Sequence, residues 1–79
     1  MMLPFTNNIR MLRFLAGEMT QTDLGERVGV TRQTIAAIEQ GKYSPSLEVA
    51  SGIAQVFGKP LDQVFIPNQV TPSAITGPH

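Results

Sequence analysis

The residues able to carry chemistry in this sequence are few, and most of them are polar rather than reactive. There is no cysteine, and the single histidine, His79, is the last residue. The sequence has no glycine-rich phosphate loop and no cluster of Asp, Glu and His at the spacing that metal binding or acid–base catalysis requires. We therefore expect a protein that is not an enzyme and that holds neither a metal nor a cofactor.

Two adjacent side chains with planar hydrogen-bonding groups, Arg32 and Gln33, are the most informative of the remaining residues. A guanidinium group matches O6 and N7 of guanine, and a carboxamide matches N6 and N7 of adenine. Taken alone, an Arg-Gln pair is more often an ordinary solvated helix face. The choice between these interpretations depends on the elements that position the pair.

The size and charge of the chain limit its class. It has 79 residues, enough for one domain, with six basic and six acidic side chains. Zero net charge argues against DNA binding, because a protein that neutralises phosphates is usually basic. No apolar run approaches the ~18 residues that would span a bilayer, so we expect a soluble, cytoplasmic protein.

The periodicity of apolar residues predicts an all-α fold, a compact bundle of five short helices with no convincing strand. We expect helices at about residues 8–17, 20–28, 32–40, 47–57 and 60–64. Thr20, Thr31 and Ser46 are predicted N-caps. The residues expected to face the core are Ile9, Met11, Leu12, Phe14, Ala16, Leu24, Val28, Ile35, Ile38, Leu47, Ala50, Ile53, Ala54 and Phe57. Met11 and Phe14 could instead face a partner. Residues 1–7 are expected to form an arm, residues 8–66 the domain, and residues 67–79 a proline-containing tail.

Two glycines indicate how the second and third helices meet. Gly25 lies inside a predicted helix, where glycine costs roughly 1 kcal/mol relative to alanine. A glycine that is present despite this cost suggests a close backbone contact at that point. Gly29 follows the helix and tolerates the left-handed conformation that a short turn requires.

Residues 19–24 (MTQTDL), 28–35 (VGVTRQTI) and 38–47 (IEQGKYSPSL) together resemble the helix-turn-helix of the phage repressor/Cro family, also called the XRE family. Residues 61–65 (LDQVF) resemble the closing segment of that family. The resemblance covers about residues 8–65 and implies a lambda-repressor-like DNA-binding domain. It also implies a sequence-specific transcriptional regulator, expected to be a repressor, that inserts helix 32–40 into the major groove of double-stranded DNA.

The resemblance implies roles for individual residues. Gln21 would bind a phosphate and brace the recognition helix, and Arg32 and Gln33 would read bases. Ala36 and Ala37 would touch thymine methyl groups or let the helix approach closely. The whole set of DNA-binding residues is expected to be Gln21, Thr31, Arg32, Gln33, Thr34, Ala36, Ala37, Lys42 and Tyr43, with Thr34, Lys42 and Tyr43 on phosphates.

Arg13 and Glu39 resemble the internal ion pair of the family, which joins the first helix to the recognition helix. The loop from residue 15 to residue 19 is one residue longer than the common spacing, with Glu18 as the extra residue. Arg10 is therefore the alternative partner for Glu39.

Repressors of this family bind pseudo-palindromic operators as homodimers. The expected dimer interface is an apolar patch of Leu61, Val64, Phe65 and Ile66, although Leu61 and Phe65 could instead close the monomer core. Two other functions remain open at this stage. One is an antitoxin-like regulator that also binds a partner protein through the tail, and the other is a pure protein-interaction module.

Overall fold

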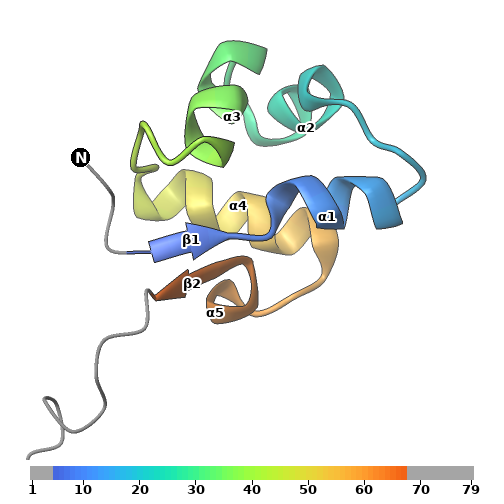
Figure 1. Cartoon of the computed structure of the whole chain (residues 1–79). Helices are drawn as coiled ribbons and strands as arrows, with labels where there is room; N and C mark the ends of the chain where they lie inside the picture. The colour runs from blue at the N-terminus through green and yellow to red at the C-terminus, as the bar shows by residue number, and fades with distance from the viewer. Residues whose placement is uncertain (1–4, 68–79) are drawn as a thin grey trace, which may run out of the picture.

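Each segment with helical periodicity is a helix in the computed structural model, which describes residues 5–67 (Figure 1). The five helices confirm the predicted all-α class. Their bounds lie within two residues of those expected. The elements in chain order are β1 (Phe5–Asn7), α1 (Ile9–Leu15), α2 (Gln21–Val28), α3 (Arg32–Glu39), α4 (Leu47–Phe57), α5 (Leu61–Val64) and β2 (Phe65–Pro67).

The helix ends follow the predicted caps. Gly29 and Gly58 end α2 and α4 in the left-handed conformation, with φ of 83° and 64°. The three predicted N-cap hydroxyls each accept a hydrogen bond from a backbone N–H: Thr20 from Asp23 at 3.0 Å, Thr31 from Thr34 at 3.1 Å, and Ser46 from Val49 at 3.2 Å. These bonds satisfy amide groups that have no partner inside a helix.

A short antiparallel ribbon, which the sequence did not predict, closes the fold. β1 pairs with β2 so that Phe5 lies opposite Pro67 and Asn7 opposite Phe65. The rings of Phe5 and Phe65 meet edge to face, with centroids 5.9 Å apart. Residues 5–7 are therefore part of the fold rather than a separate arm, while residues 1–4 and 68–79 lie outside the described chain.

The core lies where the helices meet. Its fully buried side chains are Ile9, Leu24, Ile35, Ile38, Ile53 and Val64. The prediction that Val64 faces a second subunit is wrong, because its side chain is fully buried in this core. Phe65 also packs against the core, and Ile66 is half-buried in the ribbon, so Leu61 is the most exposed member of the predicted dimer patch.

Four residues expected in the core lie at the surface instead. Ala16 is exposed because α1 ends at Leu15, one residue before it. Leu47 is exposed because it begins α4, at the edge of the bundle. Met11 and Phe14 lie on the side of α1 that faces away from the core, and both are exposed. Among the described residues, no helix is long and apolar enough to span a bilayer.

The contact predicted at Gly25 is present. A Cβ added there would lie 2.6 Å from the carbonyl oxygen of Val30, closer than any side-chain atom tolerates. The Gly25 carbonyl also accepts hydrogen bonds from the N–H groups of Gly29 and Val30, at 2.8 and 2.9 Å. The missing side chain therefore lets the turn before α3 fold back onto α2.

We predict that Gly25→Ala lowers the free energy of unfolding by about 1–3 kcal/mol, because the added methyl group must push the backbone apart. Urea unfolding would measure this loss. Gly52→Ala is the matched control. Its Cβ would meet Val28 at an ordinary 3.5 Å, so the substitution in α4 should stabilise the protein by about 0.5–1 kcal/mol. A stable Gly25→Ala variant would contradict the close contact.

Candidate nucleic-acid interface

The start of α3 presents two polar side chains to solvent. Thr31, the N-cap, holds the first turn through its bond from the Thr34 N–H, and the two threonine hydroxyls lie 3.0 Å apart. Arg32 and Gln33 follow directly and are exposed. Because the cap fixes where the helix begins, it also fixes the direction in which these two side chains leave it.

The carboxylate of Glu39, at the other end of α3, joins three helices. Arg13 of α1 donates two hydrogen bonds to it, from Nε at 2.7 Å and from Nη2 at 3.0 Å. Gln21 of α2 donates a third from Nε2 at 3.1 Å. Only 15% of the Arg13 side chain and 9% of the Glu39 side chain are exposed. Arg13 is thus the partner of Glu39, and Arg10, the alternative partner, does not pair with it.

The network continues from Glu39 to the exposed end of α3. The Gln21 carboxamide oxygen accepts a long hydrogen bond from Nη1 of Arg32, at 3.4 Å. Arg13 also donates from Nη1 to the carbonyl of Met19, at 2.8 Å, which anchors the loop before α2. Both ends of the Gln21 carboxamide are therefore engaged, and this side chain braces Arg32 against the body of the protein.

The loop after α3 carries the other predicted contacts. Gly41 has φ of 74°, and the Lys42 N–H bonds to the carbonyl of Ala37 at 2.9 Å. Lys42 and Tyr43 are exposed beyond this turn. Ala36 and Ala37 are half-buried on α3. All nine predicted DNA-contact residues thus lie on α2, on α3 or in the adjoining turns.

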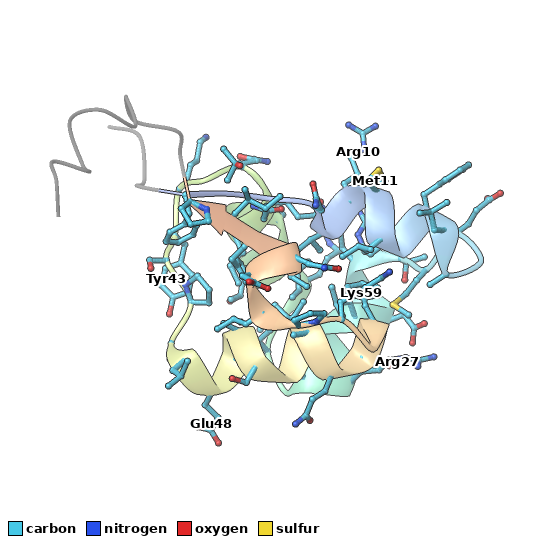
Figure 2. The ribbon with its side chains drawn as sticks, turned by 90° about the horizontal axis from the view of Figure 1, so that it is seen from below. Arg10, Met11, Arg27, Tyr43, Glu48 and Lys59 are labelled. Carbon is cyan, nitrogen blue, oxygen red and sulfur yellow. The ribbon has the colours of Figure 1, made fainter. Side chains whose placement is uncertain are left out.

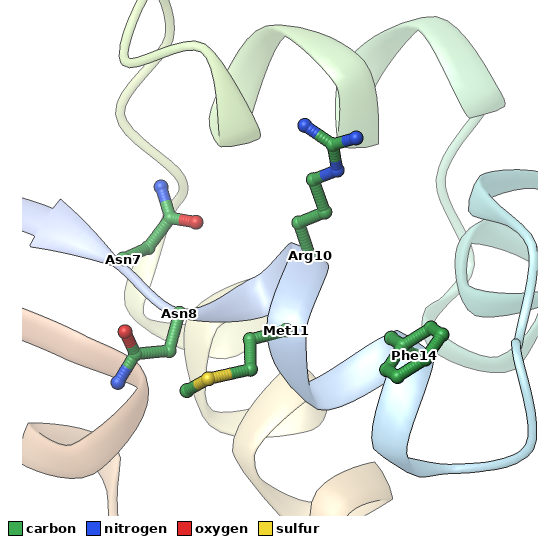
Figure 3. Close-up of a pocket in the computed structure, with 5 residues that line it drawn as sticks. All are labelled: Asn7, Asn8, Arg10, Met11 and Phe14. Atoms are coloured by element: carbon green, nitrogen blue, oxygen red, sulfur yellow. The ribbon is translucent and has the colours of Figure 1, made fainter.

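Arg10 lies beside α3 without being the partner of Glu39. It projects from α1 toward α3 (Figure 3). It lines a hollow of about 400 Å³ with Arg13, Gln21, Ala36, Glu39 and Gln40. Since Arg13 is already paired with Glu39, Arg10 adds a cation beside the middle of α3.

The charges are distributed unevenly despite their zero sum. Glu39 is neutralised by Arg13, and Asp23 pairs with Arg27 at 3.4 Å. Figure 2 places Glu48 at the opposite edge of the molecule from Arg10. A neutral chain can therefore present a locally positive face around the start of α3.

Two short helices crossing at a glycine, with a capped second helix that exposes arginine and glutamine, define the helix-turn-helix class of DNA-binding proteins. The comparisons with known proteins specify the family. A family model described as Helix-turn-helix matches residues 9–64. The chain belongs to this family, the XRE-type helix-turn-helix transcriptional regulators.

Several curated proteins are similar to the chain. An uncharacterized HTH-type transcriptional regulator of Methanocaldococcus jannaschii is 48% identical over 60 residues, 76% of this chain and 89% of that protein. The regulator YgzD of Bacillus subtilis is 49% identical over 59 residues, 75% and 88% of the two chains. The cryptic phage CTXphi transcriptional repressor RstR of Vibrio cholerae is 32% identical over 60 residues, 76% and 53% of the two chains.

Solved structures show the same fold. The crystal structure of a hypothetical transcription factor from Neisseria superposes with a TM-score of 0.67 at 26% identity, covering 78% of this chain and 70% of that one. A Bacteroides fragilis protein superposes with a TM-score of 0.66 at 23% identity, covering 77% and 97% of the two chains.

We predict that Glu39→Ala lowers the free energy of unfolding by about 3 kcal/mol, because it leaves the Arg13 guanidinium poorly paired in a largely buried position. Thermal or urea unfolding would measure the loss. Arg27→Ala is the control. It breaks a pair whose side chains are 54% and 45% exposed, and such a surface pair is worth at most about 1 kcal/mol. Equal effects of the two substitutions would contradict a structural role for Glu39.

Proposed function

We propose that the protein is a sequence-specific repressor that binds a pseudo-palindromic operator as a homodimer, with α3 in the major groove. The observation that carries the proposal is the exposure of Arg32 and Gln33 at the capped start of α3. The network through Gln21 limits where the Arg32 guanidinium can lie. A side chain that favours one position before binding loses less entropy on the base than one with no such preference.

The remaining contacts divide into two groups. Thr31, Thr34, Lys42 and Tyr43 are proposed to meet phosphates, which set the register of α3 without reading sequence. Ala36 and Ala37 are short enough to let the helix enter the groove, and their methyl groups suit thymine. Gln21 is proposed to brace Arg32 through its carboxamide oxygen, while the second N–H of its Nε2 is left for a phosphate.

The proposed homodimer is suggested by the small surface with which one subunit can contact DNA. One α3 covers about half of a typical operator, and two such helices reach successive major grooves when they lie about 34 Å apart. The similarity to a protein named as a phage transcriptional repressor favours repression as the outcome. The antitoxin-like alternative rests on residues 68–79, which lie outside the described chain, and nothing in the fold favours it.

Selection of bound duplexes from a random library tests the proposal directly. We expect a two-fold symmetric motif whose half-sites are one helical turn apart. Salt titration of binding to random DNA should give a shallow slope, since few cations reach phosphates from each subunit. Binding that ignores salt, or no binding at all, would leave the protein-interaction module as the function.

We predict that Arg32→Ala weakens operator binding by about 1–3 kcal/mol and relaxes base preference at one position of each half-site. Affinity for the operator and for its single-base variants would measure both effects. Lys42→Ala is the matched control, because loss of a phosphate contact weakens all duplexes by a similar factor. If Arg32→Ala also weakened all sequences equally, Arg32 would be a phosphate contact.

A further inference from the structure

Helix α1 exposes an unusual amount of apolar surface. Met11, Phe14 and Leu15 are 53%, 64% and 69% exposed. Half of the large exposed apolar side chains of the described chain thus lie on this one seven-residue helix. A contiguous apolar patch on a small protein usually marks an interaction surface. We call Met11, Phe14 and Leu15 the α1 patch.

Hollows flank the α1 patch. One, of about 460 Å³, is lined by Asn7, Asn8, Arg10, Met11 and Phe14 (Figure 3). Another, of about 310 Å³, is lined by Leu12, Leu15, Ala16, Val56, Phe57 and Lys59. The patch therefore has both protruding side chains and depressions beside them, as a self-complementary helix face requires.

Charges of opposite sign lie beside the α1 patch. Arg10 lies four residues before Phe14 and Glu18 four residues after it. Glu18 follows the end of α1: its N–H bonds to the carbonyl of Phe14, at 3.0 Å, and Gly17 and Glu18 both have positive φ, of 85° and 61°. Arg10, Phe14 and Glu18 all border one surface hollow. Among the described residues, Arg10 and Glu18 form no ion pair with each other.

We infer that the α1 patch is the interface between two copies of this chain, packed with their α1 helices antiparallel about a two-fold axis at Phe14. In this arrangement each Arg10 faces Glu18 of the other copy, and Phe14 packs on Phe14. In a two-fold interface the same surface of each copy meets the other, so a contact between one residue and a second is repeated in reverse. The inference deepens the proposed function, on whose homodimer it rests, by assigning the subunit contact.

The position of α1 suits the spacing of two recognition helices. The Arg13–Glu39 pair ties α1 to α3. Helices in contact lie 8–10 Å apart, so three such steps, from α3 through the two α1 helices to α3 of the partner, span about 24–30 Å. This is of the same order as the ~34 Å between successive major grooves, though shorter. The surface of α5 is less suited to a subunit contact. Val64 is buried in the core, and the main exposed apolar side chain of α5 is Leu61, which is 38% exposed.

Sedimentation equilibrium of the full chain tests the inference. We expect a wild-type mass of twice the 8.6 kDa chain. Phe14→Glu should raise the dimer dissociation constant by about tenfold or more, as for a central interface aromatic residue. Leu47→Glu is the matched control, because Leu47 is equally exposed on α4, and it should leave the constant unchanged. A cooperative unfolding transition and wild-type helix content by circular dichroism would show that both variants fold, since loss of the dimer itself lowers the melting temperature.

Charge exchange tests the antiparallel arrangement. Arg10→Glu and Glu18→Arg should each weaken the dimer by about two- to fivefold, and the double variant should restore it. A protein that stays monomeric, both free and on its operator, would overturn the inference. If Leu61→Glu dissociates the dimer and Phe14→Glu does not, the inferred α1 interface is wrong, although the protein is still a homodimer.

The inference and the proposed function fail in different ways. If Phe14→Glu keeps its preference for a half-site duplex but loses the additional affinity for the full operator, the inference is supported. If the wild-type dimer forms through the α1 patch but binds all duplexes equally, the interface stands and the proposed function fails.

Discussion

The Glu39 carboxylate is the point at which α1, α2 and α3 are joined. It accepts two hydrogen bonds from Arg13 and one from Gln21, in a position with little exposure to water. A carboxylate in such a position is stable only when its charge and its lone pairs are satisfied. The three helices must therefore adopt a single relative arrangement, and that arrangement sets where Arg32 and Gln33 leave the surface.

The glycine contact and the caps act together with this ion pair. Gly25 brings the turn against α2, and Thr31 begins α3 at a defined residue. A rigid start to α3 suits a chain with zero net charge. If α3 binds DNA as proposed, few cations are available for phosphates, so discrimination between sequences would come mainly from hydrogen bonds to bases rather than from electrostatic attraction.

Much of this architecture could be predicted from the sequence, because local signals determine it. Cap residues, glycines and helical periodicity gave the helices, and the unfavourable Gly25 indicated the backbone contact that the structure contains. The ribbon was missed because three-residue strands from opposite ends of the domain have no periodicity to detect. The errors at Phe14 and Val64 share a cause: short apolar segments do not reveal which of their faces the rest of the chain covers.

The ribbon of β1 and β2 joins the two ends of the domain to α3. The Asn7 carboxamide, at the end of β1, donates to the carbonyl of Ile38 in the last turn of α3, at 3.0 Å. The Asn8 N–H also bonds to the carbonyl of Val64, at 3.0 Å. A ribbon of three-residue strands opens more readily than a buried helix. Each opening would remove the Asn7 contact from the last turn of α3, so amide exchange there should be faster when β1 is unpaired, although Glu39 still ties this turn to α1 and α2.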